Sequence, residues 1–179
     1  MSRVPYQQVA TALRAAASAL LQGSYSLPHL FHGTEEHFDK FDLAKAGKND
    51  EGFLGRGVYF STDVTVANSF PVRMEVKVRL QNPYLMELQS LSFQKNLVLR
   101  EQLGLPASAS AQTITTELKR RGHDGVVLDY SPAGYRHKEV VVFDPNDIAI
   151  VNVTEPPPDE KDKIIKRRAR WAREKAGGW

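Results

Sequence analysis

Three residues with side chains suited to holding and reacting a ribose lie far apart in this chain: His32, Tyr59 and Glu139. A neutral imidazole can hydrogen-bond a ribose hydroxyl, and a tyrosine ring can stack on a flat cationic ring. A carboxylate can stabilise the positive charge that develops on a ribose when its glycosidic bond breaks. The three side chains therefore suit a reaction in which a ribose parts from a positively charged base.

The residues around them fit the same chemistry. Gly33 can offer its backbone N–H and C=O to a ligand with no side chain in the way. Gly55 and Gly57 let the backbone before Tyr59 come close to a ligand, and Phe70 could cover the opposite face of a ring stacked on Tyr59.

Each of the three residues also has a purely structural interpretation. His32 could be a hydrogen-bonded core histidine, Tyr59 a core aromatic, and Glu139 the solvated end of a strand. Taken singly, none of them decides between structure and chemistry.

The elements that would position these residues are strands and helices without regular alternation. Alternating or apolar runs predict strands over 29–34, 57–61, 74–80, 84–86, 125–130, 139–143 and 148–153. Helical spacing predicts helices over 5–22, 63–70, 91–103, 111–121 and 159–175, the second capped by Thr62 or Asp63. Because regular βαβ units are absent from this pattern, we expect an α+β fold with largely antiparallel sheets.

Domain organisation follows from length and from one proline run. With 179 residues and 41% hydrophobic content, the chain suits one globular domain with appendages. The prolines at 156–158 mark a boundary. We expect an N-terminal helical segment over 1–27, a main domain over 28–155, and a basic helix or tail over 156–179.

The positive charge is concentrated in that tail. Residues 163–175 hold seven Lys or Arg and one acid, a local charge of +6, so the rest carries −3 of the total +3. Arg167, Arg168, Arg170 and Trp171 could bind RNA by gripping phosphates and stacking on a base. The alternative is a solvated amphipathic helix that packs Ile164, Ile165, Arg168 and Trp171 against the domain or a partner.

Composition excludes several other functions. There is no cysteine, so disulfides, thiolate metal sites and a cysteine nucleophile are excluded. The five histidines form no HxxxH or HExxH pattern, and we expect no metal. The apolar run 9–21 is interrupted by Arg14 and is too short for a bilayer, so we expect a soluble protein.

Three sequence motifs, in this order, resemble the motifs of one enzyme class. Phe-His-Gly-Thr (31–34), Gly-Arg-Gly-Val-Tyr-Phe (55–60) and Glu-Val-Val-Val-Phe-Asp-Pro (139–145) resemble the words of the His-Tyr-Glu class of ADP-ribosyltransferases. This is the class of diphtheria toxin and the poly(ADP-ribose) polymerases. The motifs most resemble those of small bacterial and phage toxin or effector domains. The resemblance covers residues 30–153 and implies a split β-sandwich with peripheral helices and with NAD in its cleft.

The resemblance also implies roles for single residues. Glu139 would be catalytic, and NAD would be bound by His32 at the adenosine ribose, by Gly33 and Thr34 near the carboxamide, and by Tyr59 and Phe70 around the nicotinamide. Phe70 stands where polymerase-type relatives carry Tyr, and Ala67 where they carry Ser. The motifs of the Arg-Ser-Glu class are not matched.

By that resemblance, we expect an NAD-dependent mono-ADP-ribosyltransferase of the toxin or effector type, with a protein or RNA acceptor and no metal. A toxin would need a cognate immunity or antitoxin protein. It would act in the cytoplasm of the producing or target cell, in the second case as a secreted effector. Three alternatives remain: an NAD glycohydrolase, an RNA 2′-phosphotransferase of the same fold using Arg56, Arg73 and Arg136, and a silent or nucleic-acid-binding module.

Overall fold

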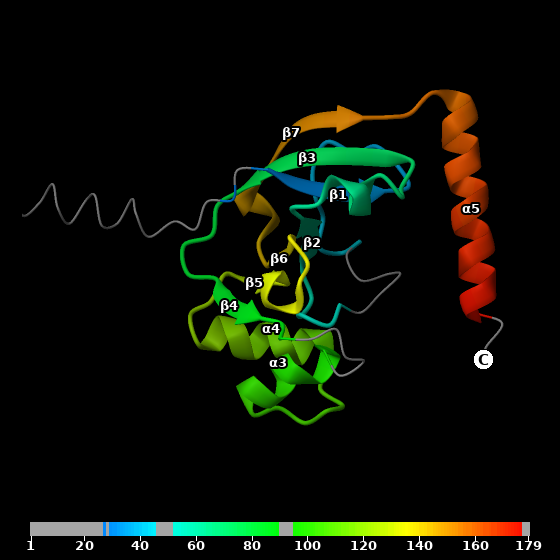
Figure 1. Ribbon diagram of the computed structural model, residues 1–179. Coiled ribbons are helices and arrows are strands. Elements are labelled where there is room, and N and C mark those ends of the chain that lie inside the picture. The colour runs from blue at the N-terminus through cyan, green and yellow to red at the C-terminus, as the bar shows by residue number, and fades with distance from the viewer. Residues whose placement is uncertain (1–26, 28, 46–51, 90–94, 177–179) are drawn as a thin grey trace, which may run out of the picture.

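The computed structural model describes residues 27, 29–45, 52–89 and 95–176 (Figure 1). The predicted N-terminal helix over 5–22 and most of the loop over 45–52 lie outside the described residues. So do the first four residues of the helix predicted over 91–103.

Within these described residues, seven strands and four α-helices follow one another, with two 3-10 turns. The strands are β1 (Leu30–Thr34), β2 (Val58–Ser61), β3 (Val72–Val78), β4 (Tyr84–Glu87), β5 (Gly125–Asp129), β6 (Lys138–Val142) and β7 (Ile148–Thr154). The helices are α2 (Val64–Ala67), α3 (Lys95–Leu103), α4 (Ala111–Arg120) and α5 (Pro158–Ala176), and the turns are η1 (Ser131–Ala133) and η2 (Pro145–Asp147). The predicted strands all exist, and the α+β class is confirmed.

Helix α2 is shorter than the helix predicted over 63–70. Asp63 caps its N-terminus, as expected, by accepting a hydrogen bond from the Thr65 N–H at 2.9 Å. The helix ends after one turn at Ala67, with Asn68 as its C-cap. Pro71 then disfavours the helical conformation at Phe70, the residue before it. The chain then enters β3 directly, which leaves Phe70 at the junction.

The strands form one sheet in the order β4-β5-β6-β2-β1-β3-β7. All neighbours are antiparallel except β4 and β5, which are parallel. Strands β1 and β2 register only one residue pair, Phe31 with Ser61, whereas each pairs along its length with its other neighbour. The sheet therefore splits at this junction into two halves (Figure 1).

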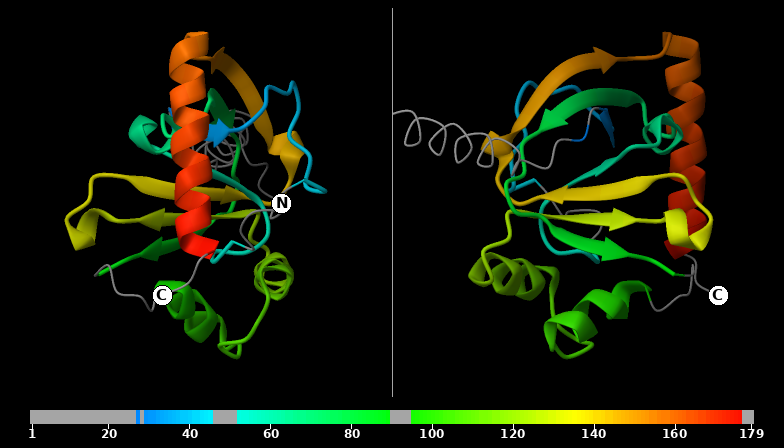
Figure 2. Two further views of the ribbon diagram at one scale, coloured as in Figure 1. Left: turned by 90° about the vertical axis from the view of Figure 1, so that its right-hand side faces the viewer. Right: turned by 60° about the vertical axis from the view of Figure 1, so that its left-hand side comes forward.

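Strand β6 shows how the halves and helices pack into layers. Val140 and Val142 enter a core shared with β1 and β3, whereas Val141 and Phe143 enter a second core shared with α3 and α4. Successive side chains of a strand point to opposite faces, so a strand buried on both faces reads as a continuous apolar run. Figures 1 and 2 show the resulting order of half-sheet, half-sheet and helical layer.

Helix α4 fixes the glycine-rich segment that precedes β2. Its Thr115 hydroxyl donates to the backbone carbonyl of Arg56 at 3.0 Å, and the Arg56 N–H donates to the carbonyl of Ala111 at 3.1 Å. Gly55 has a φ of +108°, and a Cβ there would lie 2.7 Å from Thr115 Oγ1. Glycine at 55 is thus required both by conformation and by the approach of α4.

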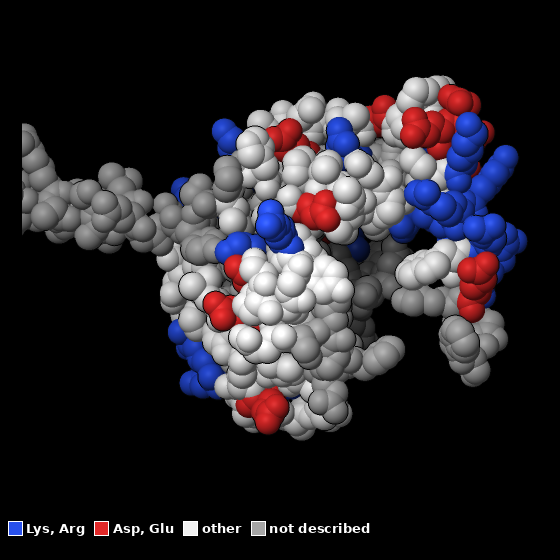
Figure 3. All heavy atoms as spheres, viewed as in Figure 1, with Lys and Arg blue, Asp and Glu red and all other residues white. Residues whose placement is uncertain are grey.

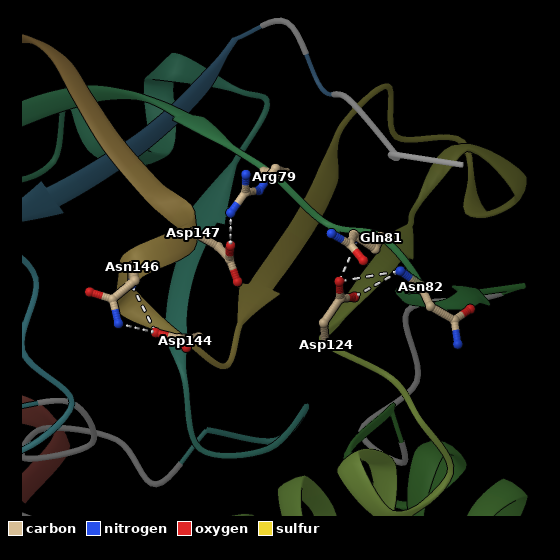
Figure 4. Close-up of polar contacts among 7 residues, drawn as sticks. All are labelled: Arg79, Gln81, Asn82, Asp124, Asp144, Asn146 and Asp147. Atoms are coloured by element: carbon tan, nitrogen blue, oxygen red, sulfur yellow. Dashed lines mark hydrogen bonds and ion pairs between the residues drawn. The ribbon is translucent and has the colours of Figure 1, made fainter. Parts of the chain in front are cut away.

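Acidic side chains fix two of the connections (Figure 4). The Asp124 carboxylate accepts hydrogen bonds from the backbone N–H groups of Gln81 and Asn82, which joins the end of β3 to the start of β5. Asp144 accepts from the N–H of Asn146 at 2.9 Å within the turn that leads to β7.

Helix α5 runs along one side of the molecule, past both halves of the sheet (Figures 1 and 2). Its basic side chains gather on that side in Figure 3. Most of its described side chains are exposed, including Ile165 (43%) and Trp171 (56%), whereas Ile164 and Arg168 are half-buried. Among the described residues, no helix combines the length and apolarity needed to cross a membrane.

Candidate active site

The three residues singled out by their chemistry lie on adjacent strands in the middle of the sheet. His32 is on β1, Tyr59 on β2 and Glu139 on β6. Ser61 of β2 pairs with Phe31 of β1 and with Glu139, so one row crosses the three strands. Segments separated by more than a hundred residues in sequence therefore meet at the place where the sheet splits.

The His32 imidazole bridges the split. Its Nδ1 lies 2.8 Å from the backbone carbonyl oxygen of Tyr59. Because a carbonyl only accepts, Nδ1 carries the proton and Nε2 is an acceptor in the neutral ring. Burial lowers the pKa of His32 below its ordinary 6.5, against the smaller effect of this hydrogen bond. Near neutral pH the ring is uncharged and suited to accept a hydroxyl hydrogen bond.

Phe70 lies directly over the backbone of β1. A Cβ added to Gly33 would overlap the Phe70 ring, so no larger residue fits at 33 with this packing. Thr34, the last residue of β1, pairs with Val72 at the start of β3. The structure thus brings together Gly33 and Phe70, two of the residues expected to surround the nicotinamide.

Tyr59 is held by its hydroxyl. The hydroxyl donates to the carbonyl of Gly55 at 2.7 Å and accepts from the N–H of Leu54 at 3.0 Å. The ring is half-buried beside the second core and lies 6.5 Å from the ring of Phe53. Tyr59 therefore has both a structural role and a partly accessible ring, and the two interpretations of it are compatible.

Glu139 lies on the same face of the sheet as Tyr59. In the β2–β6 register, Tyr59 is opposite Val141 and Ser61 is opposite Glu139, and alternate residues of a strand share a face. Glu139 is half-buried, and its Oε2 accepts a hydrogen bond from the Tyr130 hydroxyl at 2.8 Å. The carboxylate is therefore a fixed, partly shielded group and not a solvated strand end.

Sequence reasoning missed Tyr130. It ends the strand predicted over 125–130, and the antiparallel pairing of β5 with β6 brings that end beside Glu139. A tyrosine at the end of an otherwise aliphatic strand was the available signal, but it points to Glu139 only once the strand order is known.

The residues expected to bind an acceptor divide into two groups. Arg168 is half-buried, and its guanidinium carbon lies 3.7 Å from the centre of the Phe70 ring. Its Nε donates to Glu35 at 2.6 Å. In contrast, Arg167, Arg170 and Trp171 are exposed on α5.

Within residues 27, 29–45, 52–89 and 95–176, no group of three or more His, Cys, Asp or Glu could hold a metal ion. The face of the sheet that carries Glu139 also carries Tyr59, and an aromatic ring near a carboxylate suits an organic cation.

Comparison with known proteins gives one family. The profile described as ADP-ribosyltransferase in polyvalent proteins matches residues 26–155. Among solved structures, a similar one is the crystal structure of the M. tuberculosis MbcT–MbcA toxin–antitoxin complex, with 10% identity and a TM-score of 0.39. The similarity covers 82% of this chain and 94% of that one. No curated protein matches the sequence.

Proposed function

This chain belongs to the family of ADP-ribosyltransferases in polyvalent proteins, and we propose that it transfers single ADP-ribose units from NAD to a protein or RNA acceptor. The main support is the shared sheet face of Tyr59 and Glu139, next to the strand that carries His32. An aromatic ring and a carboxylate then share one face, and the His32 imidazole is tied to the same strand by its hydrogen bond to the Tyr59 carbonyl.

In the proposed reaction, the bond between the ribose and nicotinamide breaks and its electron pair leaves with the neutral nicotinamide. Positive charge develops on the ribose, and Glu139 stabilises it. The Nε2 of His32 accepts a hydrogen bond from the adenosine ribose, and Tyr59 and Phe70 hold the nicotinamide. A nucleophile of the acceptor then attacks the ribose and loses its proton.

The first test measures nicotinamide release from NAD by the purified chain and by Glu139→Gln. We expect the variant to lose activity by about 100- to 1000-fold, as when one stabilising group for a transition-state charge is removed. Glu87→Gln changes an exposed carboxylate on β4 and should leave release unchanged. Unchanged activity of a folded Glu139→Gln protein would contradict the role of Glu139.

Labelled NAD decides between transfer and hydrolysis, which share the bond-breaking step. Label on protein or on RNA from a bacterial lysate identifies the acceptor class. Nicotinamide release without label would instead mean an NAD glycohydrolase.

We also propose that the chain acts as a toxin or effector in the cytoplasm of the producing or target cell, restrained by a cognate inhibitor protein. The support is the resemblance of its three sequence words to small bacterial toxin domains. Expression in bacteria should arrest growth, and Glu139→Gln at equal level should not. Equal growth with both proteins would contradict a toxin role.

A further inference from the structure

Tyr130 lies behind the carboxylate that the proposed function makes catalytic. Its side chain is only 4% exposed and its hydroxyl donates to Glu139 Oε2 at 2.8 Å. The ring stacks on His137, with centroids 4.4 Å apart and planes 21° apart. Both the ring and the hydroxyl are therefore fixed, which limits the rotamers open to Glu139.

The Tyr130 hydroxyl stays a hydrogen-bond donor at any pH the protein encounters. Burial raises the pKa of Tyr130 strongly, and the charge of Glu139 and the nearby Tyr59 raise it further. Because the Tyr130 hydroxyl keeps its proton, it always donates to the Glu139 carboxylate, and this hydrogen bond favours the charged form of Glu139.

The charged residue next to Glu139 in sequence forms an ion pair with a neighbouring strand. Lys138, the preceding residue, forms an ion pair with Asp129 of β5 at 2.7 Å, and this contact helps lower the pKa of Asp129 to about 2. Across β2, the residue opposite Glu139 is the neutral Ser61. The hydrogen bond from Tyr130 to Oε2 is therefore a direct contact that can hold the Glu139 carboxylate.

We propose that Tyr130 is a positioning residue: it holds Oε2 of Glu139 from behind, so that the other carboxylate oxygen faces the ribose. The inference rests on the proposed function, because it assigns a partner to the residue that would stabilise the ribose charge.

The test is Tyr130→Phe, which keeps the ring and its stack on His137 and removes only the hydroxyl. We expect kcat for nicotinamide release to fall about tenfold or more, since a hydrogen bond to a charged group is lost, with little change in NAD affinity. The acid limb of the pH–rate profile should move to higher pH, because the carboxylate loses a donor. Tyr135→Phe is the matched control, since Tyr135 is 46% exposed and touches the same His137 ring.

Two results separate the inference from the proposed function. If the wild-type chain releases nicotinamide and a folded Tyr130→Phe matches it in kcat and pH profile, the positioning role is wrong. If the wild type releases none, the proposed function fails. NMR titration of the Glu139 carboxyl still tests the Tyr130–Glu139 contact in that case. Loss of the hydroxyl donor in Tyr130→Phe must raise the pKa of Glu139, and an unchanged pKa would contradict the contact.

An independent contact concerns Phe70. The Arg168 guanidinium lies on its ring at 3.7 Å and is held there by Glu35, at the end of β1. A guanidinium is a flat cation, as is the nicotinamide ring of NAD, and both are attracted to an aromatic face. Most other described residues of α5 are exposed.

From this contact we infer that α5 is an inhibitory strap, in which Arg168 competes with nicotinamide for Phe70. The inference rests on the proposed role of Phe70. Full-length Arg168→Ala should therefore bind NAD several-fold more tightly, and Glu35→Gln should shift affinity in the same direction. Arg173→Ala, an exposed change on the same helix, should not alter affinity.

Calorimetry of NAD binding in the Glu139→Gln background provides a readout that needs no turnover. Unchanged affinity in Arg168→Ala, or weaker binding, would contradict the strap, the second because Arg168 would then be a ligand of NAD. If none of the proteins binds NAD, the proposed function itself fails and the strap fails with it.

Discussion

Gly33 and Phe70 define the tightest approach between two candidate site residues. A methyl group at 33 would overlap the Phe70 ring, so Gly33→Ala must push the ring away or shift β1. We expect a loss of about 1–3 kcal/mol in the free energy of unfolding, the usual cost of overpacking. Chemical denaturation measures it.

A double-mutant cycle tests the cause of that loss. In a Phe70→Ala background the obstacle is gone, so Gly33→Ala should cost less by about 0.5–3 kcal/mol, the range for residues in contact. Equal costs in the two backgrounds would show that the methyl group is opposed by something other than Phe70.

His32 makes stability depend on pH. Its pKa in the folded protein lies below the ordinary 6.5, so the unfolded chain binds a proton more readily. The stabilisation is complete above about pH 6.5 and is lost as the pH falls towards the folded pKa. Thermal unfolding between pH 7.5 and 5 should show a smaller acid loss in His32→Asn than in the wild type. Parallel curves would mean that burial does not shift the pKa of His32.

At the scale of elements, single carboxylates fix the connections between strands. Asp124 is half-buried and receives hydrogen bonds from two backbone N–H groups across a gap of about forty residues, whereas the exposed Asp144 caps only its own turn. Asp124→Ala should cost about 2 kcal/mol in stability and Asp144→Ala about 1 kcal/mol or less. Urea unfolding compares them, and a larger cost at Asp144 would reverse this ranking.

Most of the strands and helices could be predicted from the sequence. The apolar run from Val140 to Phe143 predicts a strand because it suits burial on both faces of a sheet. The three motifs that contain His32, Tyr59 and Glu139 each lie on or beside a strand, as predicted. The Tyr130–Glu139 and Arg168–Phe70 contacts could not be predicted, since both depend on strand order and on where α5 packs. Helix α2 was predicted too long, because it ends at Ala67 and not at Phe70.

At the scale of the whole molecule, the exposed cations of α5 form a continuous basic side (Figure 3). If this surface binds single-stranded RNA, affinity should fall with salt, with a log–log slope of about −0.7 per phosphate contact. Replacing both Arg167 and Arg170 by Ala should then reduce the slope by about 1.4. The control replaces Lys77 and Lys119, exposed cations of β3 and α4. Salt-insensitive or absent binding would contradict RNA binding by this surface.

Strands β1 and β2 register only the Phe31–Ser61 pair, so the His32 ring provides an additional link between them. Where the backbone ladder is missing, the bond from its Nδ1 to the Tyr59 carbonyl serves as an extra rung between the halves of the sheet. In the proposed function, the opposite nitrogen of the same ring binds a ribose. Ligand binding at that nitrogen would then be coupled to the relative orientation of the two half-sheets, because the same ring joins them.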